Sequence, residues 1–322
     1  MTAALWLVAA WAQTAPLDAW LADHPPPEAA EDTYVYASDL FADLAARSAD
    51  RPGVTVTSLG ATTQGRPIWA WQVAATGEEE RKVLIFAGIH ALEWISTEVA
   101  AATLRALLDH PREHTSVTVV PLLNPDGRAK VEADLAADRA RYRRGNAAGV
   151  DLNRDFAVNH DATSLWRRVL PGYHASSPAP LSQPETRALD ALADRERFDR
   201  AASLHAFGGF FYFPWSGRWE RPDDWGRFMA LGRAMEEAQG VHAYRTRQLS
   251  RWGFFFRAQG SEIDHLYGRY GTLAFLVELT RSGIDPLHPA DLRTPFRWYN
   301  PRDPEPTLRL GVAAMEALID AP

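Results

Sequence analysis

Residues 83–123 read VLIFAGIHALEWISTEVAAATLRALLDHPREHTSVTVVPLL, and their apolar pattern indicates the fold class. Val83 to Gly88 is a short continuous apolar run, which is typical of a strand buried on both faces. Glu93 to Leu108 has the length and spacing of a helix, and Val117 to Leu123 is a second apolar run. Strand, helix and strand in this order predict a βαβ unit with parallel strands.

The flanking sequence extends this alternation of strands and helices. Apolar patterns predict further strands at Val54 to Ser58, Pro67 to Ala75, Ala201 to His205 and Thr272 to Leu279, and helices at Tyr34 to Ala49, Pro184 to Arg195, Trp225 to Gln239 and Thr307 to Ile319. The stretch from Asn124 to Gln183 is predicted to be irregular, and loops of that length are usually functional. We therefore predict a single α/β domain with a mixed, mostly parallel central sheet and helices on both faces.

The composition is that of an acidic globular protein. Of its 322 residues, 46% are hydrophobic, and the formal net charge is -7. This charge argues against nucleic acid as a partner. The chain has no cysteine, so it has no disulfides and no thiolate ligands, and a zinc site must use His, Asp or Glu.

The N-terminal sequence MTAALWLVAAWAQTA has features of an export signal. Ala3 to Ala12 is apolar and too short to span a bilayer, and Ala10-Trp11-Ala12 fits a cleavage site. We predict a signal peptide over 1–12, an N-terminal segment over 13–33 and the main domain over 34–322, hence a secreted or periplasmic protein without a membrane span. The alternatives are a buried N-terminal helix or a start codon assigned too far downstream, and the protein is cytoplasmic if the apolar stretch is retained.

Four polar side chains stand where predicted strands end. His90 and Glu93 lie between a strand and a helix, His205 ends a second strand, and Glu278 ends a third. Ligands of open α/β sheets bind beyond the carboxyl ends of strands, and imidazole with carboxylate suits zinc. A lone His-x-x-Glu is a weak signal, but a carboxylate at the end of an apolar strand is unfavourable unless it is paired or functional.

The order of the motifs resembles the zinc carboxypeptidase family whose type member is pancreatic carboxypeptidase A. The resemblance runs from about Tyr34 to Ala317 and rests on Gln64-Gly65-Arg66-Pro67-Ile68, His90-x-x-Glu93-Trp94, Asn124-Pro125-Asp126-Gly127, Gly149 to Arg154, Pro184-Glu185-Thr186-Arg187, His205 and Glu278-Leu279. It implies a catalytic domain over 34–322 that binds one Zn²⁺ per chain. It further implies a monomeric hydrolase acting on peptides with a free C-terminal carboxylate.

By this resemblance, His90, Glu93 and His205 bind the zinc, the His₂Glu ligand set of the type member. Asp151 accepts a hydrogen bond from His90 and fixes its tautomer, unless it is only a cap or turn residue. Glu278 is the general base that takes a proton from water and passes it to the leaving amine.

The resemblance also assigns residues that hold the substrate. Arg143 matches the arginine that polarises the scissile carbonyl, although its neighbours Arg141 and Arg144 leave the register open by one or two places. Asn153 and Arg154 match the pair that grips the terminal carboxylate, because a planar guanidinium binds a carboxylate in bidentate fashion.

The chain departs from the type member at three places. Phe256 and Phe207 stand where the family usually has substrate-contacting tyrosines, and Leu92 replaces an arginine of an outer subsite. Each phenylalanine keeps the ring and lacks the hydroxyl, which removes a hydrogen bond of about 0.5–1.5 kcal/mol. These departures concern the substrate and leave the reaction class unchanged.

Ile263 matches the floor of the side-chain pocket, and Ala258 and Leu276 are consistent with an apolar wall. We therefore expect a preference for an apolar or aromatic C-terminal residue. One alternative is a cell-wall enzyme of the same fold that cleaves γ-D-glutamyl–diaminopimelate bonds, which the missing hydroxyls favour and Ile263 disfavours. An inactive binding module is the other alternative, and the presence of all the expected ligands and the base argues against it.

Overall fold

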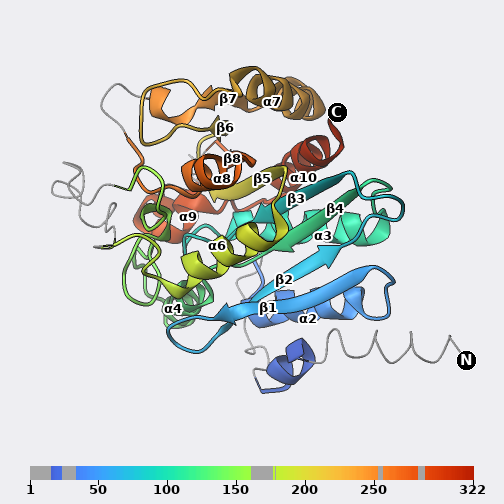
Figure 1. Cartoon of the computed structure of the whole chain (residues 1–322). Coiled ribbons are helices and arrows are strands. Elements are labelled where there is room, and N and C mark those ends of the chain that lie inside the picture. Colours follow the sequence, from blue (N-terminus) through green and yellow to red (C-terminus); the bar gives the residue numbers. More distant parts are fainter. Residues whose placement is uncertain (1–15, 24–33, 161–176, 178, 253–256, 282–286) are drawn as a thin grey trace, which may run out of the picture.

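Eight strands form one mixed sheet in the computed structural model, which describes residues 16–23, 34–160, 177, 179–252, 257–281 and 287–322 (Figure 1). Their order across the sheet is β1-β2-β4-β3-β5-β8-β6-β7. The strands are β1 (Val54–Ala61), β2 (Pro67–Val73), β3 (Arg81–Phe86), β4 (Thr115–Val120), β5 (Arg200–Ala206), β6 (Phe210–Phe213), β7 (Arg245–Gln248) and β8 (Leu273–Leu279).

The centre of the sheet is parallel. Strands β4, β3, β5 and β8 pair in parallel, as do β6 and β7, whereas β1 and β2, β2 and β4, and β6 and β8 pair antiparallel. All residues of β4 and β5 are buried, as expected for parallel strands covered on both faces. The predicted mixed, mostly parallel sheet in a single α/β domain is confirmed.

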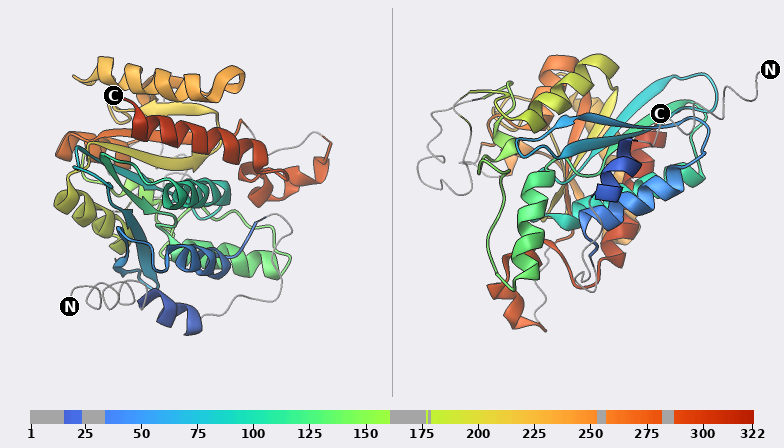
Figure 2. Two further views of the ribbon diagram at one scale, coloured as in Figure 1. Left: turned by 90° about the vertical axis from the view of Figure 1, so that its right-hand side faces the viewer. Right: turned by 90° about the horizontal axis from the view of Figure 1, so that it is seen from below.

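Alternation along β3 shows how the two faces are filled. Val83 and Ile85 pack in one core cluster with residues of α2, α3, α7 and α10, while Leu84 and Phe86 pack in another with residues of α6 and α8. Successive side chains of a strand point to opposite faces, so these helices cover both faces of the sheet, as predicted. On the first face α10 runs between α7 and α3 (Figure 2).

The longer helices lie close to their predicted positions. They are α2 (Ala37–Ser48), α3 (Trp94–Asp109), α6 (Pro184–Glu196), α7 (Trp225–Gln239) and α10 (Glu305–Asp320). Shorter helices, which the sequence patterns did not predict, are α8 (Glu262–Tyr270) and α9 (Pro295–Tyr299), together with the 3-10 turn η1 (Leu152–Arg154).

The prediction of an irregular stretch from residue 124 to residue 183 was wrong at its start, where α4 (Pro125–Ala136) forms. Asn124 caps this helix by accepting a hydrogen bond from the backbone N–H of Gly127 at 2.9 Å, and Pro125 occupies the first turn. Its buried face includes Asp126, Arg128 and Asp134. A helix that buries charged side chains lacks the apolar periodicity by which helices are predicted.

Part of the N-terminal segment is ordered against the domain. Residues 16–23 are helical, and Leu17 is fully buried in the core. The predicted signal peptide over 1–12 lies outside the described residues, as does Phe256. Within the described ranges, no helix has both the length and the apolar character needed to cross a membrane.

Candidate metal centre

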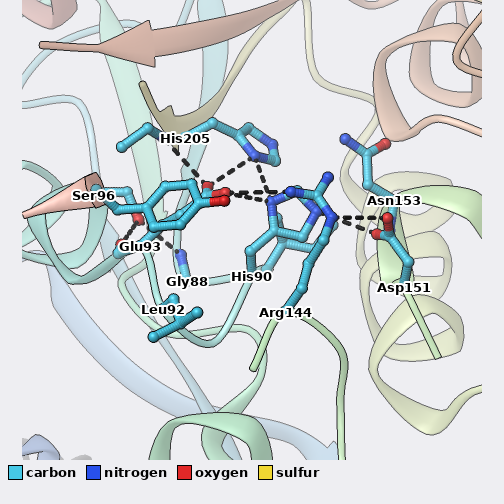
Figure 3. Close-up of polar contacts among 12 residues, drawn as sticks. Gly88, His90, Leu92, Glu93, Ser96, Arg144, Asp151, Asn153 and His205 are labelled. Carbon is cyan, nitrogen blue, oxygen red and sulfur yellow. Dashed lines mark hydrogen bonds and ion pairs between the residues drawn. The ribbon is translucent and has the colours of Figure 1, made fainter. Parts of the chain in front are cut away.

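Three predicted ligands meet at the carboxyl end of the parallel strands. His90 follows β3, Glu93 immediately precedes α3, and His205 lies near the end of β5, the neighbour of β3. The Nδ1 atom of His90 lies 2.8 Å from Oε1 of Glu93 and 3.0 Å from Nδ1 of His205, which lies 3.2 Å from Oε2 of Glu93 (Figure 3). The three side chains are buried, and they could hold a metal ion between them.

The donor set fits zinc. Zinc–nitrogen bonds of about 2.0–2.1 Å in tetrahedral geometry place two ligand atoms roughly 3.3 Å apart. The two Nδ1 atoms lie 3.0 Å apart, and each lies 2.8–3.2 Å from one of the two carboxylate oxygens of Glu93. Two imidazole nitrogens that face each other at 3.0 Å attract each other only when a proton or a cation lies between them. Both Nδ1 atoms are thus directed as metal ligands are.

Asp151 lies behind His90. Its Oδ1 atom is 3.1 Å from Nε2 of His90, and its Oδ2 atom accepts from Nε of Arg144 at 2.9 Å. Asp151 also caps η1 by accepting from the backbone N–H of Asn153 at 3.0 Å, so both expected roles coincide in one side chain. Burial raises the pKa of Asp151, but Arg144 and His90 outweigh it and hold the pKa well below its usual range.

A second carboxylate, which sequence patterns did not single out, lies behind His205. The Nε2 atom of His205 is 2.9 Å from Oε1 of Glu262 and 2.9 Å from Oγ of Ser203. Burial lowers the pKa of His205, but its hydrogen bonds to Glu262 and Glu93 reverse the effect and raise the pKa to about 10. A cation at this site competes with that proton, because a metal ligand must be deprotonated.

A pocket of about 330 Å³ opens beside the three ligands. It is lined by His90, Arg144, Asn153, Arg154, His205, Ala206, Phe207, Leu249, Trp252, Ala258, Leu276, Glu278 and Tyr299. The Oε2 atom of Glu278 has no hydrogen-bond partner among the described residues. Burial raises the pKa of Glu278 to about 8, against the opposing positive charge of His205. Glu278 is thus a half-buried residue at the pocket whose Oε2 atom is buried and lacks a hydrogen-bond partner among the described residues.

Of the two adjacent arginines Arg143 and Arg144, only Arg144 lines the pocket. Arg143 does not line the pocket, and its Nε atom instead bonds to Asp134 of α4. Arg144 does line the pocket, and its Nη1 atom lies 3.5 Å from Oε1 of Glu93. The two adjacent side chains thus have different partners, and the register left open by the sequence decides which of them faces the pocket.

Asn153 and Arg154 both line the pocket. The Oδ1 atom of Asn153 accepts from the backbone N–H of Glu262 at 3.3 Å, which leaves the side-chain NH₂ group as a donor. Arg154 is only 7% exposed, and burial lowers its pKa from the usual value. With Arg144, it brings a second guanidinium to the pocket, which favours an anionic group of the substrate.

Ile263 is placed behind the pocket and does not form part of its lining. It is fully buried in the same core cluster as Leu249, Ala258 and Leu276, and those three residues line the pocket. Ala258, Leu276 and Leu249 thus form an apolar part of the pocket lining.

The other two departures from the family differ in their placement. Leu92 is buried in a core cluster, away from the pocket lining. Phe207 is 39% exposed at the pocket, with its ring centroid 5.6 Å from that of Tyr299. Tyr299 and Trp252 also line the pocket, and sequence patterns marked neither of them because no motif surrounds them.

Comparison with known proteins identifies the family. The sequence profile of the zinc carboxypeptidase family matches residues 40–294, so the chain belongs to the zinc carboxypeptidases. Carboxypeptidase A2 of Mus musculus is 23% identical over 266 residues, which cover 78% of this chain and 63% of that protein. The chain thus spans less than two thirds of that relative's length.

Solved structures share the fold. Thrombin activatable fibrinolysis inhibitor superposes with a TM-score of 0.73 at 20% identity, covering 89% of this chain and 73% of that one. Murein-tripeptide amidase MpaA from Escherichia coli O157 superposes with a TM-score of 0.50 at 21% identity, covering 80% of this chain and 96% of that one. The resemblance inferred from motifs is confirmed for the family and the fold, and zinc is the metal of that family.

Proposed function

We propose that this protein is a zinc carboxypeptidase that hydrolyses the C-terminal peptide bond of peptides with a free terminal carboxylate. The observation that carries the proposal is one pocket that contains His90 and His205 of the metal cluster, the carboxyl group of Glu278 and the guanidinium of Arg154. A metal ion and a base together can hydrolyse an amide, and the buried guanidinium of Arg154 favours substrates that end in a carboxylate.

His90, Glu93 and His205 are the ligands of the zinc ion in this proposal. When bound there, zinc supplies a Lewis acid that polarises a carbonyl and acidifies water. Glu278 takes a proton from the attacking water and gives it to the leaving amine. Its raised pKa suits both steps, because a group that titrates near neutral pH can accept a proton and then release it.

Arg144, in place of Arg143, donates hydrogen bonds to the oxygen on which negative charge develops. Its ion pairs with Asp151 and Glu93 hold the guanidinium at the edge of the metal cluster. Preorganised donors of this kind stabilise the transition state without reorganising during the reaction. Asn153 and Arg154 hold the terminal carboxylate of the substrate, which makes the enzyme an exopeptidase.

The side chain of the C-terminal residue lies against Leu249, Ala258 and Leu276 in this proposal. An apolar wall favours an apolar or aromatic residue, because burying its surface contributes about 25 cal/mol per Å². Ile263 supports this wall from behind, and the proposed contact of Phe256 with the substrate remains a prediction from the sequence alone.

A cell-wall amidase that cleaves γ-D-glutamyl–diaminopimelate bonds is the second candidate. The shared fold with a murein-tripeptide amidase favours it. The same apolar wall disfavours it, since diaminopimelate carries an ammonium and a carboxylate at the end of its side chain. Burying these charges without partners is unfavourable.

A substrate panel separates the two candidates. The zinc-loaded protein is incubated with peptides that end in Phe, Leu, Lys or Glu and with a muropeptide, and the products are identified by mass spectrometry. We expect release of a single Phe or Leu, inhibition by a chelator and recovery with zinc. Cleavage of the muropeptide alone would replace the proposal by its alternative.

We further propose that the protein is exported and acts as a monomer. Export is supported by the apolar stretch Ala3 to Ala12 and its small-residue end. N-terminal sequencing of the protein recovered from the periplasm or the medium tests export, and light scattering tests the monomer. A retained Met1 or a stable dimer would contradict the respective statement.

A further inference from the structure

Glu262 is a fully buried carboxylate at the start of α8, directly behind the imidazole of His205. Its Oε1 atom lies 2.9 Å from Nε2 of His205, and its Oε2 atom has no hydrogen-bond partner among the described residues. Burying a carboxylate is unfavourable unless it is paired. The histidine is thus the side chain that compensates for the burial of Glu262.

We propose that Glu262 is a positioning residue that holds His205 as a metal ligand, an inference that rests on the ligand set of the proposed function. Histidine presents one nitrogen as a ligand when its other ring nitrogen carries the proton and donates it. Glu262 accepts from Nε2 of His205 and so leaves the lone pair on Nδ1, the atom that faces His90 and Glu93. Its negative charge also makes the ring a stronger donor to a cation.

The arrangement around His205 parallels that around His90. His90 has Asp151 behind it at 3.1 Å, and His205 has Glu262 at 2.9 Å. The two outer carboxylates are linked, because Asn153, which donates its N–H to Asp151, accepts from the backbone N–H of Glu262. Both rings are therefore fixed by one connected set of polar groups spanning η1 and α8.

Ser203 limits the effect of removing Glu262. Its hydroxyl oxygen lies 2.9 Å from the same Nε2 atom of His205, so it remains as a neutral acceptor. A carboxylate is the stronger acceptor, because hydrogen bonds to ionised groups are about twice as strong as neutral ones. We therefore expect weakened, not abolished, zinc binding when the carboxylate is lost.

The experiment measures the zinc Kd of Glu262→Ala and Glu262→Gln by competition with a chromophoric chelator, with folding followed by circular dichroism. Glu185→Gln is the matched control, because Glu185 is also a fully buried glutamate with one unpaired oxygen and lies outside the pocket lining. Loss of an outer partner typically weakens metal binding ~10–100-fold. We expect that loss in Glu262→Ala, a smaller loss in Glu262→Gln, and an unchanged Kd in the control.

A second readout reports the tautomer of His205 directly. Nitrogen-15 NMR of the zinc-loaded wild type should show a protonated, hydrogen-bonded Nε2 on this ring, and the signal should shift in Glu262→Gln even if Glu262→Ala fails to fold. Unchanged zinc Kd and unchanged ring signals in a folded Glu262 variant would overturn the inference, as would an equal loss of affinity in Glu185→Gln. If His205→Ala also retains tight zinc, the proposed ligand set itself fails.

Discussion

His205 of β5 and Glu278 of β8 occupy the same register position on two adjacent parallel strands. Side chains in register on neighbouring strands leave the sheet on the same face, so the proposed metal ligand and the proposed base are set side by side by strand pairing. Ligands of α/β sheets bind at this end of the strands. The sheet therefore fixes the relative position of the two groups, and either can be replaced without breaking the strand pairing.

His205→Ala should abolish stoichiometric zinc binding and leave the fold largely intact, because it removes one of three ligands from a buried site. Metal content after dialysis measures the effect. His265→Ala is the control, since His265 is also buried but pairs with Asp190. Tight, stoichiometric zinc in His205→Ala would refute the ligand set.

Glu278→Gln should bind zinc normally and lose turnover by ~10²–10⁴-fold, because glutamine keeps the shape and polarity but cannot accept the proton. Steady-state kinetics on a peptide that ends in Phe measure the loss, with metal content checked in parallel. Near wild-type kcat in the zinc-loaded variant would show that Glu278 is not the base.

The acid limb of the pH profile of kcat/KM should have its midpoint at a higher pH than the ordinary glutamate pKa of 4.5. Glu278 acts as a base only when ionised, and burial raises its pKa from 4.5 toward 8. Activity is therefore lost as pH falls through this raised pKa. The positive charge of a bound cation lowers the pKa of Glu278, so the midpoint of the limb should lie below about 8. Wild type should show a limb between these values. A limb at or below pH 4.5 would contradict this assignment.

Arg144→Ala should reduce kcat far more than Arg143→Ala, although the two residues are adjacent. Removing a donor to a developing oxyanion typically lowers kcat by ~10²–10³-fold, and only Arg144 lines the pocket. Arg143 bonds to Asp134 of α4 and does not line the pocket, so its loss should leave kcat near wild type. A larger loss of kcat in Arg143→Ala than in Arg144→Ala would restore the register first predicted from the sequence.

The core of the fold could be predicted because its strands carry continuous apolar runs. The predicted strand Val83 to Gly88 corresponds to β3, and the predicted helix Trp225 to Gln239 matches α7 residue for residue. Helix α4 could not be predicted in this way, since it is specified by the cap at Asn124 and by buried charges such as Arg128. Capping signals show where a helix starts, but only apolar spacing shows that it continues.

The candidate site could be predicted where residues belong to motifs and could not where contacts are distant in sequence. His90, Glu93 and His205 meet as expected. Glu262 contacts His205 across 57 positions and stands in no recognisable motif, so only the folded chain reveals the pair. Sequence alone could not show that Arg144 lines the pocket and Arg143 does not, because the direction of a side chain in a loop depends on its tertiary contacts.

In the proposed function, Arg154 selects substrates with a terminal carboxylate, and the adjacent peptide bond is hydrolysed with zinc. The ratio of kcat/KM for one peptide ending in Phe, as the free acid and as the amide, tests this selection in zinc-loaded wild type and in Arg154→Ala. We predict a strong preference for the acid in wild type. The variant should lose it mainly through KM, because the carboxylate is bound in ground and transition states alike. An acid-to-amide ratio that is unchanged in Arg154→Ala, or that is near one in wild type, would contradict the account.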